Sequence, residues 1–86
     1  MKANEVGAAA KAELEALTEL TAETVSSIQR QGELWEVTVD MIELHMTPNS
    51  RDVLAVYAVQ LADSGDLLGY KRVGRYVRSQ LDISTD

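Results

Sequence analysis

The ionisable and nucleophilic side chains of this 86-residue chain form no recognisable catalytic pattern. His45 is the only histidine and there is no cysteine, so carboxylates alone would have to complete a transition-metal site. The 14 Asp and Glu residues include no pair at a catalytic spacing, and we expect Glu36, Asp40 and Glu43 on a solvated strand face. Ser64 lies in the sequence DSGD, without the strand, turn and helix that surround a nucleophilic serine. We therefore predict a protein that is not an enzyme and needs no metal or other cofactor.

A cluster of cations in an otherwise acidic chain is the clearest binding signal. The formal net charge is −6, yet residues 67–81 hold four of the eight lysines and arginines and no acid. The cluster and its tyrosines comprise Tyr70, Lys71, Arg72, Arg75, Tyr76 and Arg78. These residues could neutralise acidic strands nearby, or form a docking patch in which arginines donate forked hydrogen bonds to a partner's carboxylates. They could also bind nucleic acid, but the acidity of the rest of the chain argues against nucleic acid as the main partner.

Length and composition indicate one domain, residues 1–86, with flexible ends at 1–6 and 79–86. No stretch approaches the ~20 consecutive apolar residues of a membrane span. The first residues also lack the uninterrupted apolar run of a secretory signal. The absence of cysteine fits a reducing compartment. We therefore expect a cytoplasmic protein that does not bind membranes.

The first element is predicted to be a helix. Asn4 is a suitable N-cap, and Glu5 in the first turn complements the helix dipole. Residues 8–17 are mostly strong helix formers. The apolar stripe of this helix is predicted to comprise Ala10, Leu14, Leu17 and Thr21. Because alanine buries little area, this helix needs a sheet to pack against.

Period-two patterns then predict four antiparallel strands, at 25–31, 34–44, 53–63 and 67–77. Trp35, Val37, Val39 and Met41 fall on one face of the second strand, and the alternation slips at Met41–Ile42. A helix over residues 70–78 is the alternative for the last element, but Gly69 and Gly74 favour a strand. The predicted fold is α+β, with an N-terminal helix packed on a four-stranded antiparallel meander. This order is similar to the PepSY type of two-layer domain.

The second sheet face is predicted to carry an apolar strip made of Ile42, Leu44, Leu54 and Val56. One helix covers only one side of a small sheet, so these side chains are exposed unless the C-terminal tail or a homodimer partner covers them. An exposed apolar patch on a soluble domain usually marks an interaction site.

Taken in order, these segments resemble the gas vesicle protein O family. The resemblance runs from about Leu14 to Arg78 and is most specific in DVLAVYAV (52–59), DSGDL (63–67) and GYKRVGRYVR (69–78). Upstream, VSSI (25–28), LWEVTVDMIEL (34–44) and TPNSRDVLA (47–55) fit the same succession. The chain departs from the family's usual residues at four surface positions: His45, Met46, Ala58 and Ala62.

The resemblance implies a non-enzymatic accessory protein that binds other gas vesicle proteins, either the shell subunit or accessory proteins, during shell assembly. Such a protein would lie in the cytoplasm, free or associated with gas vesicles. The alternative function is regulation of gas vesicle gene expression through nucleic acid or a transcription factor. The candidate contact residues are the cationic cluster and the apolar strip.

Overall fold

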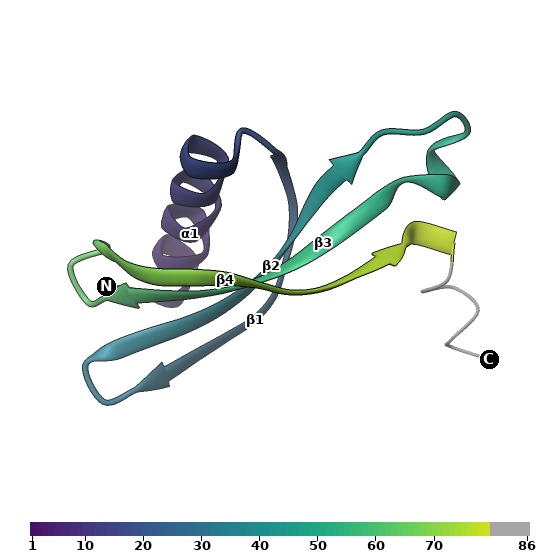
Figure 1. Ribbon diagram of the computed structural model, residues 1–86. Coiled ribbons are helices and arrows are strands. Elements are labelled where there is room, and N and C mark those ends of the chain that lie inside the picture. The colour runs from purple at the N-terminus through teal and green to yellow at the C-terminus, as the bar shows by residue number, and fades with distance from the viewer. Residues whose placement is uncertain (80–86) are drawn as a thin grey trace.

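Within residues 1–79, the part of the chain that the computed structural model describes, one helix precedes a four-stranded sheet. The elements are α1 (Ala3–Thr18), β1 (Thr21–Gln31), β2 (Leu34–Leu44), the short 3-10 helix η1 (Asn49–Arg51), β3 (Val53–Ala62) and β4 (Leu67–Val77). The strands lie in the order β1-β2-β3-β4, and each neighbouring pair is antiparallel. Figure 1 shows α1 against one face of the sheet, with β2 and β3 extending beyond it.

This arrangement confirms the α+β class and the helix-then-meander order. It also shows a strand through residue 77, where a helix over 70–78 was the alternative. Residues 80–86, and with them most of the predicted flexible segment 79–86, lie outside the described residues. The other predicted flexible segment, 1–6, includes the start of α1, and its Val6 is fully buried.

Lys2, and not Asn4, is the N-cap of α1. The prediction was wrong because Glu5 reaches back to the capping residue: its carboxylate accepts a hydrogen bond of 2.8 Å from the backbone N–H of Lys2. At the other end, Glu19 adopts a left-handed conformation with φ 62° and donates its N–H to the carbonyl of Glu15. This cap ends the helix and turns the chain into β1.

The buried face of α1 lies nearer its N-terminus than predicted, and consists of Val6, Gly7, Ala10 and Leu14. Leu17, predicted on this face, is 50 % exposed. Thr21 belongs to β1 and not to the helix, since the left-handed residue at 19 has already redirected the chain.

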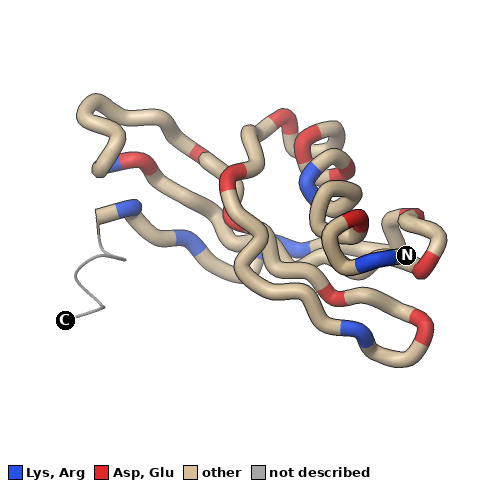
Figure 2. Tube along the Cα trace, turned by 180° about the vertical axis from the view of Figure 1, so that it is seen from behind, with Lys and Arg blue, Asp and Glu red and all other residues tan. Residues whose placement is uncertain are grey.

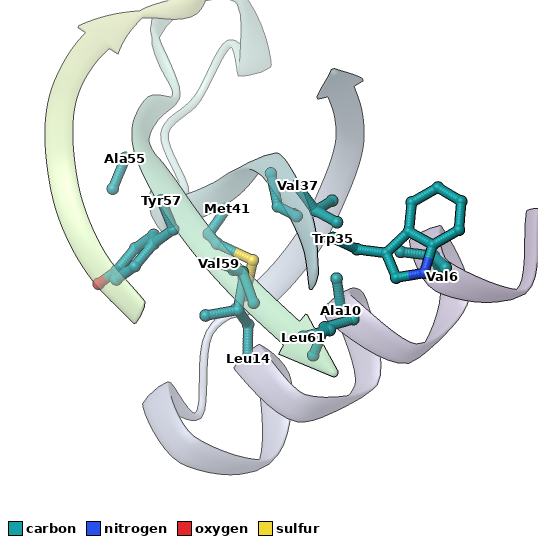
Figure 3. Close-up of a cluster of buried hydrophobic side chains, with 11 residues drawn as sticks. Val6, Ala10, Leu14, Trp35, Val37, Met41, Ala55, Tyr57, Val59 and Leu61 are labelled. Atoms are coloured by element: carbon teal, nitrogen blue, oxygen red, sulfur yellow. The ribbon is translucent and has the colours of Figure 1, made fainter. Parts of the chain in front are cut away.

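The core lies between α1 and the two middle strands (Figure 3). The predicted alternation in β2 is confirmed, because Trp35, Val37, Val39 and Met41 are all buried on the face that α1 covers. From here on this is called the helix face, and the opposite side of the sheet the open face. In β3, the helix face carries Ala55, Tyr57, Val59 and Leu61.

Trp35 closes the core at the hairpin end of the sheet. Its side chain is 8 % exposed, and its indole Nε1 donates a hydrogen bond of 3.0 Å to Oδ1 of Asp63. The guanidinium carbon of Arg30 lies 5.1 Å from the ring centroid, within the range of a cation–π contact.

Both outer strands are interrupted by bulges. Register shifts leave Glu23 and Ser26 of β1 without a directly paired residue, and Leu68 and Val73 of β4 likewise. β1 is also longer than predicted, since it begins at Thr21 and the strand was expected to begin at residue 25. These bulges make each edge of the sheet irregular.

Candidate partner-binding site

β4 forms an edge of the sheet that α1 does not cover. The helix packs mainly on β1 and β2 and less on β3. A helix about 10 Å across spans only about two strands spaced ~4.8 Å apart. The side chains of β4 therefore face outward on both sides of the sheet and along its edge.

Three large apolar side chains are exposed on β4: Leu68 (53 %), Tyr70 (43 %) and Val73 (51 %). Leu68 and Val73 are the unpaired residues of the two bulges. Tyr70 lies on the helix face, where its ring centroid is 6.2 Å from that of Tyr57. These three residues, together with Lys71 and Arg75, are called the β4 surface below.

Sequence reasoning missed Leu68 and Val73 because strict alternation assigns every strand residue to one of two faces. A bulge breaks that assignment and directs a residue along the edge. The signal was present in the sequence, since each residue precedes a glycine, Gly69 or Gly74. A glycine inside a strand pattern often marks a bulge.

The cations of the predicted cluster differ in how firmly they are paired. Arg72 donates two hydrogen bonds of 3.0 Å, from Nε and Nη2, to the carboxylate of Glu43 on β2. This forked contact raises the pKa of Arg72 and lowers that of Glu43. Arg75 is 3.8 Å from the same carboxylate and 60 % exposed. Lys71 makes no ion pair with any residue in 1–79. Within the predicted cluster, Lys71 and Arg75 are thus the cations most available to a partner.

Arg78 instead joins distant parts of the chain. Its guanidinium donates hydrogen bonds to the carboxylates of Glu23 on β1 and Asp52 before β3, and to the carbonyl of Asn49. Asp52 is 3 % exposed and also accepts a 2.8 Å hydrogen bond from the N–H of Met46. The hydrogen bond to Glu23, and to a smaller extent the one to Asp52, raises the pKa of Arg78 above its ordinary value.

Tyr76 is likewise engaged within the fold. Its hydroxyl donates a 2.9 Å hydrogen bond to Oδ2 of Asp40. Burial, followed by this bond, raises the pKa of Tyr76 to about 12. The predicted cationic cluster is therefore divided: Tyr70, Lys71, Arg72 and Arg75 lie together on β4, whereas Tyr76 and Arg78 link the end of β4 to the rest of the sheet.

The predicted apolar strip is only partly a surface. Ile42, Leu54 and Val56 share the open face, with Ile42 paired to Leu54 across the strands. Leu54 is fully buried, beside its other cross-strand neighbour Tyr76, so its expected exposure was wrong. Ile42 and Val56 are half-buried, and only Leu44 is largely exposed, at 52 %. The hydrogen bonds of Tyr76 and Arg78, which link residues across this end of the sheet, account for the difference.

The middle of the open face is polar. Two adjacent cross-strand rows form a shallow recess there, lined by side chains that include Ser27, Gln29, Glu36, Thr38, Gln60 and Lys71. Several of these residues already bond to neighbours: Ser27 Oγ donates to Thr38 Oγ1 at 3.0 Å, and Gln31 Nε2 donates to Glu36 at 2.7 Å. The recess is therefore polar, as predicted for the strand face that carries Glu36, and none of the four residues of the predicted apolar strip lines it.

His45 lies 4.0 Å from Oδ2 of Asp52 and is 72 % exposed. Among residues 1–79, no three or more His, Cys, Asp or Glu side chains gather in a way that could hold a metal ion. In the same range, no helix has the length and apolar character needed to cross a membrane.

Among residues 1–79, three carboxylates have lowered pKa values in the folded chain. In each case the largest cause is a hydrogen bond that the carboxylate accepts. The donor is the N–H of Met46 for Asp52, the Trp35 indole for Asp63 and the Arg72 guanidinium for Glu43. An unfolded chain binds protons at these groups near pH 4, before the folded chain does. The stability they contribute is therefore complete above about pH 5, and it is lost as the pH falls below about 4 and through the lowered pKa values of the folded chain.

We expect the urea midpoint to be similar at about pH 7 and pH 5.5 and to fall steeply towards about pH 3. Asp52→Asn should lower the midpoint at neutral pH and reduce the further loss on acidification, because one of the three groups no longer titrates. Trp35 fluorescence provides the measurement. A midpoint that rose on acidification would contradict this assignment.

Comparison with known proteins places the chain among gas vesicle proteins. The family model described as gas vesicle synthesis protein GvpO matches residues 1–82. Gas vesicle protein O of Streptomyces sp. (strain CB03234) is 43 % identical over 73 residues, covering 85 % of this chain and 57 % of that protein. Gas vesicle protein O1 of Halobacterium salinarum is 28 % identical over 53 residues, which is 62 % of this chain and 44 % of the relative.

The chain thus spans about half the length of the curated relatives that it matches. No solved structure matches it.

Proposed function

This chain belongs to the family of the gas vesicle synthesis protein GvpO, and from that premise we propose that it is a non-enzymatic accessory protein that binds another gas vesicle protein during shell assembly. It would act in the cytoplasm, free or associated with gas vesicles. Membership supports the gas vesicle context, and the β4 surface supports a role in binding.

The β4 surface carries this proposal. It exposes three large apolar side chains on one strand and places two incompletely paired cations, Lys71 and Arg75, beside them. Apolar exposure of this kind favours a protein partner, and the cations favour one with acidic side chains next to its apolar residues. The shell subunit or another accessory protein of gas vesicles is the partner class we propose.

The bulges determine how such a partner would dock. Between Leu68 and Val73 only residues 69–72 pair regularly with β3, so the outer edge offers a short run of main-chain groups. Strand addition needs a longer regular edge for its ladder of hydrogen bonds. We therefore assign recognition to side chains.

Individual gas vesicle proteins can be tested one at a time against the immobilised chain. Wild type should retain at least one of them, and Lys71→Glu/Arg75→Glu should weaken that binding about tenfold or more by turning attraction into repulsion. Lys2→Glu/Arg51→Glu is the matched control, since it changes the net charge equally at exposed positions away from β4.

Equal retention by wild type and the β4 variant would refute the role of this surface. Retention of no gas vesicle protein by the folded chain would refute the proposed function. If RNA or DNA bound instead, with the β4 variant defective, the regulatory alternative would replace it.

A further inference from the structure

We propose that the β4 surface also accepts α1 of a second copy of this chain, so that copies associate head to tail. The contact uses the same surface as the proposed function but requires no other protein. Figure 2 shows the charge separation on which it rests, with acidic residues along α1 and cations along β4.

The outward side of α1 is acidic and incompletely paired. Lys11 is the only cation in the helix, and its Nζ is directed to the carbonyl of Glu23 on β1. Glu13 and Glu19 make no hydrogen bond or ion pair through their carboxylates with any residue in 1–79. These two carboxylates are therefore available to cations of another molecule.

The charges of the two elements are opposite in sign. Glu13 lies within α1 and Glu19 is its C-cap, and exposed Ala12 and Ala16 lie on the side of the helix that faces away from the sheet. On β4, Lys71 pairs with Ala58 and points to the open face, whereas Arg75 pairs with Ala55 and lies on the helix face beside Glu43. Each element thus carries two charges of one sign, beside the two alanines on α1 and beside Val73 on β4.

The distances along the two elements are similar. From Glu13 to Thr18, the last residue of α1, the helix rises about 7.5 Å at 1.5 Å per residue, and Glu19 follows as the C-cap. The paired residues of Lys71 and Arg75 are three strand residues apart, about 10 Å. Between the two cations, the exposed side chain of Val73 would meet the small alanine side chains. The C-terminal part of α1, laid along the edge, would therefore bring both carboxylates near the two cations.

A single chain cannot make this contact with itself, because its own α1 packs on the opposite half of the sheet. The two surfaces in the contact are different, so a dimer still has one free surface of each kind. Such a heterologous contact continues into longer chains or closes into a ring, and does not stop at two copies.

Sedimentation and light scattering of the purified chain test this directly. The mean mass of wild type should rise with protein concentration beyond that of a dimer and fall when NaCl is raised from about 50 to about 500 mM. Two variants each remove one side of the contact: Lys71→Gln/Arg75→Gln on β4 and Glu13→Gln/Glu19→Gln on α1. Each alone should self-associate about tenfold more weakly.

Mixing the two variants gives the decisive result. Each retains the surface that the other lacks, so the mixture should form a 1:1 complex and nothing larger. The α1 variant also separates this contact from the effect of net charge. Removing two acids from a chain of net charge −6 reduces the repulsion between copies, so without the proposed contact the variant should associate more strongly than wild type. Glu33→Gln/Asp66→Asn is its matched control and should associate at least as strongly as wild type.

A wild-type chain that remains monomeric at millimolar concentration and low salt would overturn the proposal. So would a dimer that grows no further, or an α1 variant that associates like its control. These results are independent of the capture of gas vesicle proteins, so either proposal can fail while the other stands.

Discussion

Trp35→Ala should lower the free energy of unfolding by about 3–5 kcal/mol. The ring is almost fully buried on the helix face, and its removal leaves a cavity where β2 meets α1 (Figure 3). Asp63 also loses the indole N–H and Arg30 loses the ring beneath its guanidinium. For a domain of this length, total stability is on the order of 4–13 kcal/mol, so the variant should be extensively destabilised.

Urea unfolding followed by far-ultraviolet circular dichroism is the suitable measurement, because Trp35 is the only tryptophan. Trp35→Phe is the matched control: it keeps an aromatic ring in the core but loses the hydrogen bond to Asp63, and should be much less damaging. A loss below about 1 kcal/mol for Trp35→Ala would show that the ring is not part of the core.

Leu54→Ala should cost about 2–5 kcal/mol, although Leu54 lies on the face opposite α1. Its side chain is fully buried beside Tyr76 and Ile42, whereas Leu44, from the same predicted strip, is 52 % exposed. Leu44→Ala is therefore the control and should change stability by no more than about 0.5 kcal/mol. Both variants keep Trp35, so its fluorescence reports their urea midpoints.

Equal, small effects of the two substitutions would mean that Leu54 is accessible in solution. In that case the apolar strip would again be a candidate contact surface. A large difference between them instead supports a second small core on the open face, held by the contacts of Tyr76 and Arg78.

The middle strands were predictable because each has one buried and one exposed face. Trp35, Val37 and Val39 alternate with polar residues, and this alternation does not depend on which residues lie on the neighbouring strands. The gaps between the predicted strands hold the turns, where Gly32 and Gly65 adopt the positive φ angles of 62° and 97° that glycine permits. Local chemistry was sufficient in both cases.

Long-range side-chain contacts could not be predicted. Arg78 and Glu23 are 55 positions apart, with Glu23 on β1 and Arg78 directly after the end of β4, and nothing near either residue indicates that they meet. Their contact removes Arg78 from the cationic cluster, and the same end of the sheet buries Leu54. The site residues were therefore correctly grouped along β4 only where the strand itself brings them together.

The bulged edges have a consequence for how the protein behaves at high local concentration. Neither outer strand presents an unbroken row of main-chain groups, and that row is what a growing amyloid fibril uses as a template. Many copies can therefore crowd together without seeding cross-β aggregates. Any clusters that form should dissolve again on dilution.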